Sequence, residues 1–367
     1  MTASPGRTAI RIGDHLERVR RYLAPSGVDG LLLVRTENRR YATGFTGSAG
    51  LALVTAHEAM LAVDFRYYEQ AALQAPACEI LRGGADPSAA LAEAVRARTI
   101  RRIGFESEFV PYAQAERLRE RLAPAELVPL PDVDRLRWVK DDAEIAALSR
   151  AAEISDAAFA HLATLLRPAI TEWEAALELE ISIRRAGAER ISFDTVLASG
   201  PRSALPHGRA TDRVMAAGEF VTVDFGAVYE GYAADCTRTV VLGEPDARQR
   251  HIYEVVLEAQ QTALAAIRPG VSGRDVDAAG RSVIAAAGFA DAFGHALGHG
   301  IGLDVHEGPP LSPRTEAVLE PGMVVTVEPG IYLPGWGGVR IEDDVVVTAD
   351  GCQILTHAPK GLPALPL

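Results

Sequence analysis

The sequence predicts an α+β protein of two domains, and three observations support this prediction. Residues 14–133 alternate helix-like periodic stretches with short apolar runs, as expected for an α/β domain. The segment "PLPDVDRLRWVKDDAE" then places two prolines and a polar turn before a long helical pattern, which predicts a boundary between residues 134 and 135. Beyond this boundary, a pattern of helices followed by strand, turn and strand occurs twice.

The composition argues against several functional classes. The 367 residues are 48% hydrophobic and 23% charged, which is typical of a globular protein with well-buried cores. The net charge of -12 and the lack of a lysine/arginine block argue against nucleic acid as a partner. No segment has the apolar length of a signal peptide or a membrane span, so we predict neither export nor membrane insertion. The three cysteines form no zinc-type pair or disulfide framework, which predicts a cytoplasmic protein.

Residues 1–134 are the predicted N-terminal α/β domain. Its short apolar runs are interpreted as buried strands, with helix-like stretches between them. These runs are "GVDGLLLV", "GLALVT", "AMLAVDF" and "RRIGFES". This domain is expected to be the smaller of the two.

Residues 135–367 are the predicted C-terminal domain, and they begin with two consecutive helices. In the first helix, apolar residues recur at spacings of three and four until Pro168 ends it. The second helix opens with "TEWE", where Thr171 is placed to cap backbone N–H groups and Glu174 is placed to reach back. Gly187 supplies its end.

The C-terminal domain is predicted to contain two pseudo-symmetric halves. "RPAIT" at residues 167–171 is echoed by "RPGVS" at residues 268–272, and each lies at the same spacing before a glycine. Each half then continues into a strand, a turn and a second strand. These segments are "EFVTVDFGAVYEGYAADCTRTVVL" and "GMVVTVEPGIYLPGWGGVRIEDDVVVT".

The first hairpin is predicted to bring two aspartates together. If its turn is centred between Tyr229 and Glu230, Asp224 and Asp235 lie directly opposite each other. Opposed residues in a hairpin have Cβ atoms roughly 4.5 to 5.5 Å apart. The first half therefore offers one facing carboxylate pair from otherwise apolar strands.

The second hairpin repeats this arrangement with glutamates. Glu328 and Glu342 are equidistant from Gly335, the centre of the second turn. The segment "VRIEDD" holds three adjacent acids, and strand alternation places Glu342 and Asp344 on one face. Hairpin symmetry favours Glu342 as the residue that faces Glu328.

Four acids on apolar strands predict bound cations. Burying unneutralised carboxylates this close together costs several kcal/mol unless positive charge lies between them. Two divalent ions about 3.5 to 4 Å apart, bridged by carboxylates and a water, provide that charge. Oxygen donors with one or two imidazoles favour Mn²⁺, or a neighbouring ion such as Co²⁺ or Zn²⁺, over a thiolate-type zinc site.

The motifs together resemble those of the pita-bread metallopeptidases, and specifically of the Xaa-Pro peptidases, which include prolidase and aminopeptidase P. The resemblance is carried by "VDFGAVYEGYAADCTRT", "GHALGHGIGLDVHEGP", "VVTVEPGIY" and "GGVRIEDD". "ENRRYATGFTGSAG" and "VDFRYYEQA" resemble the creatinase/prolidase-type N-terminal domain, so the likeness covers nearly the whole chain. It implies a pita-bread fold for residues 135–367 after a creatinase-type domain at residues 1–134.

The resemblance also implies a full set of metal ligands. The family's five ligand positions fall on Asp224, Asp235, His299, Glu328 and Glu342. Of these ligands, Glu328 would also serve as the proton shuttle of the reaction.

Five further residues are expected around these ligands. His295 and His306 would line the substrate site and hydrogen-bond the substrate carbonyl. His207 would lie near the proline pocket, and Arg340 would lie beside the metals on the substrate side. Thr237, two residues after a predicted ligand, is placed to hydrogen-bond a ligand from behind.

The implied function is hydrolysis of the bond between any residue and a following proline by a metal-dependent exopeptidase. We expect proline-containing dipeptides or short peptides as substrates, and the family implies a homodimer. The dipeptidase is the expected activity, and aminopeptidase P, which acts on longer peptides, is the alternative. Side chains that are candidates for shaping the leaving-group side are Arg202, Arg209, Arg213, Tyr332 and Trp336.

Three other readings of the motifs remain. A methionine aminopeptidase shares the five-ligand pattern, but the substantial N-terminal domain and "VHEGPP" argue against it. Creatinase-like hydrolases use a similar fold without metals, which the intact ligand positions disfavour. A non-catalytic pita-bread binding module would be expected to show ligand substitutions, and none is seen.

Overall fold

The structure is a computed structural model that describes residues 12–361 and 364–365. The chain divides into two compact units, Met1–Arg137 and Trp138–Leu367. Each unit has its own sheets and its own buried apolar clusters. Among the helices in the described ranges, none combines the length and the hydrophobicity that crossing a bilayer requires.

The N-terminal unit is a six-stranded sheet flanked by helices. The strand order is β4-β3-β2-β1-β5-β6, and β2 runs antiparallel to both of its neighbours while the other pairs are parallel. The strands are β1 (Gly30–Leu33), β2 (Leu51–Thr55), β3 (Ala59–Val63), β4 (Glu79–Arg82), β5 (Arg102–Glu106) and β6 (Glu126–Leu130). The helices are α1 (Ile12–Ser26), α2 (Thr36–Thr43), α3 (Tyr68–Gln74), α4 (Pro87–Ala97) and α5 (Tyr112–Leu122), with short 3-10 turns η1 (Phe65–Tyr67) and η2 (Val133–Arg137).

Both faces of this sheet are covered, which explains its continuous apolar runs. Leu32 packs into one apolar cluster with residues of α4 and α5, whereas Leu31 and Leu33 pack into another with residues of α1. Successive strand residues point to opposite faces, so a strand buried on both sides is apolar at every position.

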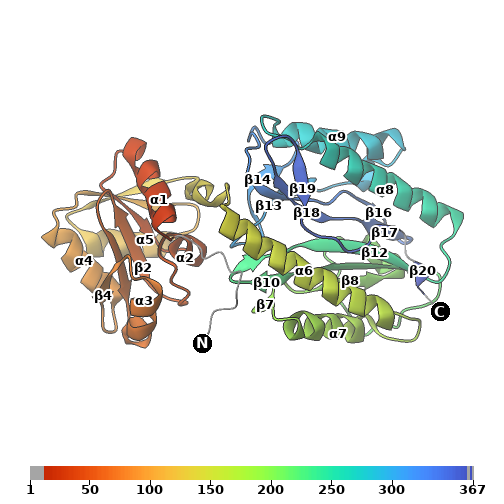
Figure 1. Ribbon diagram of the computed structural model, residues 1–367, viewed down its shortest axis with the longest axis horizontal. Coiled ribbons are helices and arrows are strands. Elements are labelled where there is room, and N and C mark those ends of the chain that lie inside the picture. Colours follow the sequence, from red (N-terminus) through yellow and green to blue (C-terminus); the bar gives the residue numbers. More distant parts are fainter. Residues whose placement is uncertain (1–11, 362–363, 366–367) are drawn as a thin grey trace. The chain divides into compact units, whose positions relative to one another are not determined.

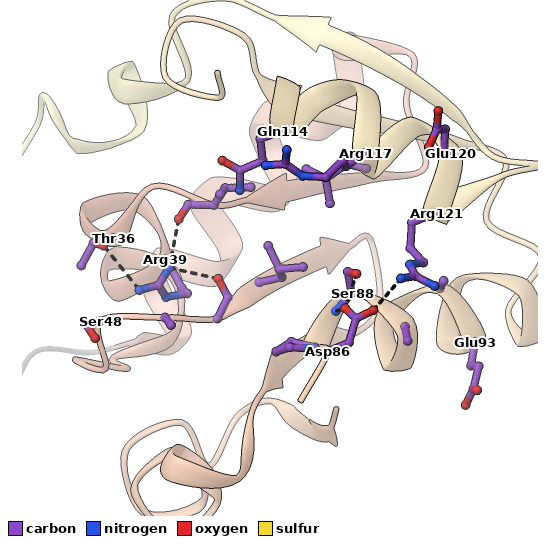
Figure 2. Close-up of a pocket in the computed structure, with 18 of the residues that line it drawn as sticks. Thr36, Arg39, Ser48, Asp86, Ser88, Glu93, Gln114, Arg117, Glu120 and Arg121 are labelled. Atoms are coloured by element: carbon purple, nitrogen blue, oxygen red, sulfur yellow. Dashed lines mark hydrogen bonds and ion pairs between the residues drawn. The ribbon is translucent and has the colours of Figure 1, made fainter. Parts of the chain in front are cut away.

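A cleft of about 1100 Å³ opens in the N-terminal unit. At its edge the buried Arg39 guanidinium donates to the backbone oxygens of Val34, Gly47 and Gly50 at 2.9, 2.7 and 3.1 Å, and so ties the end of β1 to the segment before β2. Figure 2 shows the labelled polar side chains around it, namely Thr36, Ser48, Asp86, Ser88, Glu93, Gln114, Arg117, Glu120 and Arg121. Arginines and acids both line the cleft, and its charge is therefore partly compensated.

The C-terminal unit contains two helix pairs, with strands between them (Figure 1). Its helices are α6 (Asp142–Leu165), α7 (Glu172–Arg185), α8 (Ala247–Ala266) and α9 (Gly273–Ala286), with 3-10 turns η3 (Gly200–Ala204) and η4 (Ala290–Ala292). The capping box predicted at the start of α7 is confirmed, because Thr171 accepts from the Glu174 N–H and Glu174 accepts from the Thr171 N–H. Ser272 caps α9 at the corresponding position of the second half.

The strands of this unit also follow the two halves. A four-stranded sheet has the order β20-β12-β9-β8 and a five-stranded sheet has the order β14-β13-β15-β18-β19, with small ladders β11-β10-β7 and β16-β17 beside them. Residues of α6 and α7 pack on the first sheet, and residues of α8 and α9 pack mainly on the second. The strands are β7 (Arg190–Ile191), β8 (Val196–Ser199), β9 (Phe220–Phe225), β10 (Ala227–Tyr229), β11 (Tyr232–Ala233), β12 (Cys236–Leu242), β13 (Gly298–Gly300), β14 (Glu307–Leu311), β15 (Val324–Val327), β16 (Gly330–Leu333), β17 (Gly337–Arg340), β18 (Asp343–Val347), β19 (Cys352–Ile354) and β20 (Ala364–Leu365).

The register predicted for the first hairpin is wrong by two residues. Asp224 lies opposite Thr237 rather than opposite Asp235. The physical reason is the turn, which is formed by Glu230 and Gly231, both at positive φ (48° and 82°), as a tight hairpin turn requires. Because side chains alternate with a period of two, a shift of two residues keeps Asp235 on the face of Asp224, in a diagonal position.

The turn predicted for the second hairpin is confirmed. Leu333 pairs with Gly337 around Gly335, and the same register continues in the β15–β18 ladder. This register places Glu328 and Glu342 in one row, in the gap between the two ladders. Each hairpin thus has a break in its ladder at predicted ligands, because Asp235 lies in the first break and Glu328 and Glu342 lie in the second.

Candidate metal centre

A cavity of about 850 Å³ lies in the C-terminal unit at the two interrupted hairpins. The nine predicted ligands and substrate-site residues line it, whereas Thr237 hydrogen-bonds Glu342 from outside the cavity. Of the side chains suggested for the leaving-group side, Arg209 and Tyr332 line the cavity, but Arg202, Arg213 and Trp336 do not. The first hairpin supplies two aspartates, the second supplies two glutamates, and β13 supplies His299. The topology therefore brings together residues that are more than one hundred positions apart in the chain.

Three of the predicted ligands are close enough to share one cation. Asp235, His299 and Glu342 each offer a ligand atom, and these atoms lie within 4.8 Å of one another. His299 Nε2 lies 3.7 Å from Asp235 Oδ2 and 3.5 Å from Glu328 Oε1. The imidazole therefore stands between an aspartate of the first half and a glutamate of the second.

Several carboxylate oxygens in this cavity are buried without a hydrogen-bond partner. They are Asp224 Oδ1, Asp235 Oδ1 and Glu342 Oε1, and Asp344 Oδ1 outside the cavity lining is unpartnered as well. A buried, unsatisfied acceptor costs about 1 to 3 kcal/mol, and more when it is charged. Divalent cations would satisfy these oxygens, and a set of carboxylates with one imidazole suits metals that prefer hard oxygen donors. The residues present thus fit a dinuclear metal site.

The ionisation of these acids shows the same need for positive charge. Burial raises the pKa of Asp235 well above its ordinary value, and the nearby Glu342 and Asp224 carboxylates raise it further. Burial likewise raises the pKa of Glu342 well above its ordinary value, and it raises the pKa of Glu328 to about 8. Without a cation, the Glu328 carboxyl is therefore mostly protonated at neutral pH.

His299 is held as the neutral tautomer that can bind a cation. Its Nδ1 lies 2.9 Å from the carbonyl oxygen of Gly300, which can only accept, so Nδ1 carries the proton and Nε2 presents its lone pair. Burial lowers the pKa of His299 to about 4, so the ring stays neutral above that pH. The glycines beside it are required for close approach, because a Cβ at Gly298 would lie 2.0 Å from the Thr326 carbonyl oxygen.

Arg340 connects ligands of the two halves. Its Nη2 donates to Asp224 Oδ2 at 2.6 Å, and its Nε donates to Thr237 Oγ1 at 2.9 Å. Thr237 Oγ1 in turn donates to Glu342 Oε2 at 2.6 Å. The guanidinium is nearly fully buried, and its Nη1 also donates to Tyr332 Oη at 2.9 Å. The structure therefore places Arg340 mainly as a support for the predicted ligands.

The three remaining histidines of the cavity differ in their exposure and in the hydrogen bonds of their ring nitrogens. His295 Nδ1 donates to Ala296 O at 2.7 Å, and its Nε2 lies 3.0 Å from Tyr332 Oη, so both ring nitrogens have protein partners. His306 and His207 are exposed, and the ring of His306 lies 4.4 Å from that of His299. Of the two residues predicted to contact the substrate carbonyl, His306 is thus the one with an accessible ring.

The sequence did not single out Thr326, and it offered Asp344 only as an alternative to Glu342, but both support the predicted ligands. Thr326 Oγ1 accepts from the His299 N–H at 3.1 Å and donates to Glu328 Oε1 at 3.3 Å. Asp344 Oδ2 accepts from the Asp235 N–H at 2.9 Å. Each lies two positions from a predicted ligand along a strand, so the strand alternation that placed Asp344 beside Glu342 could also have identified Thr326.

The comparisons with known proteins agree with this geometry. Metallopeptidase family M24 matches residues 146–349, more than half of the chain, and the Creatinase/Prolidase N-terminal domain matches residues 15–139. The Xaa-Pro dipeptidase of Pyrococcus horikoshii is 37% identical over 354 residues, which cover 96% of this chain and 99% of that protein.

Two solved structures are similar over nearly the full length. The Xaa-Pro dipeptidase from Bacillus anthracis has a TM-score of 0.93 and 45% identity, covering 97% of this chain and 100% of that one. The X-Pro aminopeptidase from Thermotoga maritima MSB8 has a TM-score of 0.87 and 40% identity, covering 95% and 99%. The predicted fold, a pita-bread domain after a creatinase-type N-terminal domain, is thereby confirmed. The chain belongs to metallopeptidase family M24 and is a hydrolase.

Proposed function

We propose that this chain is an exopeptidase that depends on two divalent metal ions and hydrolyses the bond between any residue and a following proline. The observation that carries the proposal is the convergence of four acids and His299 on one cavity, with buried carboxylate oxygens that lack partners. Relatives that cover nearly the whole chain are named Xaa-Pro dipeptidase and X-Pro aminopeptidase. Proline-containing dipeptides are the proposed substrates.

The five residues predicted from the motifs are the proposed ligands that would hold two divalent cations. The cations would supply a nucleophile by lowering the pKa of a bound water enough for attack on a carbonyl at neutral pH. The ligand set of Asp224, Asp235, His299, Glu328 and Glu342 favours Mn²⁺, with Co²⁺ or Zn²⁺ as alternatives.

Glu328 is the proposed proton carrier. Its buried carboxyl has a pKa of about 8 in the metal-free protein, and Thr326 holds one of its oxygens in place at 3.3 Å. It takes a proton from the attacking water and passes it to the nitrogen of the departing proline, which must be protonated to leave.

The other cavity residues bind and orient the substrate. His306, whose ring is exposed, donates to the substrate carbonyl as negative charge develops on it. His295 carries its proton on Nδ1, so it donates to the carbonyl only after changing tautomer and giving up its contacts with Ala296 and Tyr332. His207 lines the cavity and borders the proline end of the substrate. Arg340 also lines the cavity, and its hydrogen bond keeps Asp224 oriented.

The proposed activity is tested by the products of three substrates. The Mn²⁺-loaded enzyme is incubated with Ala-Pro, Ala-Pro-Ala and a longer Xaa-Pro peptide, and the products are identified by mass. We expect cleavage before proline, with Ala-Pro turned over fastest. Cleavage restricted to the longer peptides would instead indicate aminopeptidase P, and absence of cleavage of all three would contradict the proposal.

Location and assembly remain predictions. We propose a cytoplasmic enzyme, since the described cysteines, Cys78, Cys236 and Cys352, are all free thiols. We also propose a homodimer, as the family resemblance implies. Light scattering on the purified protein gives the number of chains per particle directly.

A further inference from the structure

Arg209 lies in the same row of the sheet as a proposed metal ligand. Val196 of β8 pairs with Asp224 of β9 on one side and bridges to Arg209 on the other. Neighbouring strands lie about 4.8 Å apart, so the Cα atoms of Arg209 and Asp224 are about 10 Å apart. Directly paired residues point to the same face, and all three side chains line the cavity. The Arg209 side chain therefore projects from the same face of the sheet that carries the proposed metal centre.

The partners of Arg209 distinguish it from the two neighbouring arginines of the same segment. Arg202 pairs with the fully buried Glu172, and Arg213 binds Glu219 through two nitrogens. Neither of these arginines lines the cavity. These two arginines are therefore committed to structural ion pairs.

Arg209 is held only weakly by its own partner. Its Nη2 lies 2.8 Å from Asp194 Oδ2, and the two side chains are 76% and 70% exposed. An exposed pair of this kind contributes between about 0 and 1 kcal/mol. Arg209 can therefore exchange Asp194 for another anion at little cost.

The other arginine of the cavity is not available for a substrate. Arg340 is buried, and its guanidinium donates to Asp224, Thr237, Tyr332 and the backbone oxygen of Pro206. Releasing it would leave the largely buried Asp224 carboxylate without its counter-charge, which is destabilising. Among the arginines that line this cavity, Arg209 is thus the one free to change partners.

We propose that Arg209 is a specificity-determining residue that leaves Asp194 to bind the C-terminal carboxylate of a dipeptide. This inference rests on the proposed function. An extended dipeptide spans at most about 7 Å, so a substrate held at the metal centre presents its carboxylate within reach of this side chain. Arginine pairs with a carboxylate through two parallel hydrogen bonds. In a longer peptide the same position holds a neutral peptide bond, so pairing between Arg209 and the terminal carboxylate favours dipeptides.

Asp194 has the opposite effect in this arrangement. It competes with the substrate carboxylate for one guanidinium, and its own negative charge repels that carboxylate. Removing its charge should therefore improve dipeptide binding, whereas removing the charge of Arg209 should weaken it. Neutralising either member of this ion pair should therefore change dipeptide binding in opposite directions.

The test compares Ala-Pro with Ala-Pro-amide, which lacks the terminal charge, in Arg209→Gln, Asp194→Asn and the wild-type enzyme. Losing a hydrogen-bonded charge pair should raise the KM of Arg209→Gln for Ala-Pro about 10-fold or more, with kcat little changed. We expect Asp194→Asn to lower that KM several-fold. Neither variant should change the kinetics of the amide. Arg213→Gln, which removes an arginine outside the cavity, is the matched control and should leave the ratio of the two KM values unchanged.

Each other outcome overturns the inference in a recognisable way. An equal rise of KM for both substrates in Arg209→Gln would mean that Arg209 only shapes the cavity. An unchanged KM for Ala-Pro would mean that another group binds the carboxylate. If the wild-type enzyme cleaves neither substrate, the proposed function itself is wrong, and the inference is wrong with it.

Discussion

Replacing Glu328 by Gln should reduce kcat for Ala-Pro by about 10³-fold, because general acid and base catalysis contributes about 10² to 10⁴. The amide keeps the size of the side chain and one oxygen but cannot accept and release the proton. Glu328 lies 3.5 Å from His299 Nε2 and is held by Thr326, so the substitution should leave the backbone in place. The measurement is steady-state turnover at saturating Mn²⁺, together with circular dichroism to verify the fold.

Glu320→Gln is a suitable control for this variant. Glu320 is exposed and does not line the cavity, so its substitution removes a similar charge elsewhere in the unit. It should retain wild-type turnover. If Glu328→Gln keeps more than a tenth of the wild-type kcat with full metal content, Glu328 is not the proton carrier.

The metal-free protein should lose stability as the pH rises from 6.5 to 8, and metal should prevent this loss. In the folded metal-free chain, burial holds the pKa of Glu328 near 8 and raises the pKa of Asp235 and Glu342. In the unfolded chain such carboxyls have pKa values of about 4. Folding then requires proton uptake, so the free energy of unfolding falls by about 1.4 kcal/mol per pH unit for each carboxyl that stays protonated.

The histidines fix the pH window of this test. Burial lowers the pKa of His295 and His299 to about 4, so below pH 6.5 they make the folded state more stable as the pH rises. That contribution opposes the carboxyl contribution from pH 4 to about 7.5, and it is the same with and without metal because the folded rings are neutral in both. Urea unfolding at pH 6.5, 7.25 and 8.0, with chelator or with Mn²⁺, isolates the carboxyls. Identical pH dependence with and without metal would contradict this account of the buried acids.

The proposed ligands could be found in the sequence because they lie in short motifs, and the structure brings them to one cavity. Each hairpin places its acids close to the turn, and the glycine-rich segment carries His299 on its own short strand. The ambiguity among the three adjacent acids is resolved by their partners. Asp343 points away to Arg238 and Lys360, whereas Glu342 joins Asp235 and His299. Sequence alternation alone could not separate Glu342 from Asp344.

The details that the sequence did not predict depend on exact turns and on contacts between the halves. The turn at Glu230 and Gly231 moved the register of Asp224 by two residues, because both turn residues adopt positive φ. Tyr332 was expected only to shape the substrate side, yet its hydroxyl bridges His295 and Arg340. Hydrogen bonds between individual side chains leave no periodic pattern in the sequence, which is why this bridge was not predicted.

The number of divalent cations bound per chain tests the central claim most directly. Metal-free protein is saturated with Mn²⁺, freed of excess by gel filtration, and analysed for metal by mass spectrometry. We predict two cations per chain for the wild type and for the exposed control Asp350→Asn, and the loss of at least one in Asp235→Asn. A wild-type chain that retains no cation, or an Asp235→Asn chain that retains both, would contradict the dinuclear site on which the account rests.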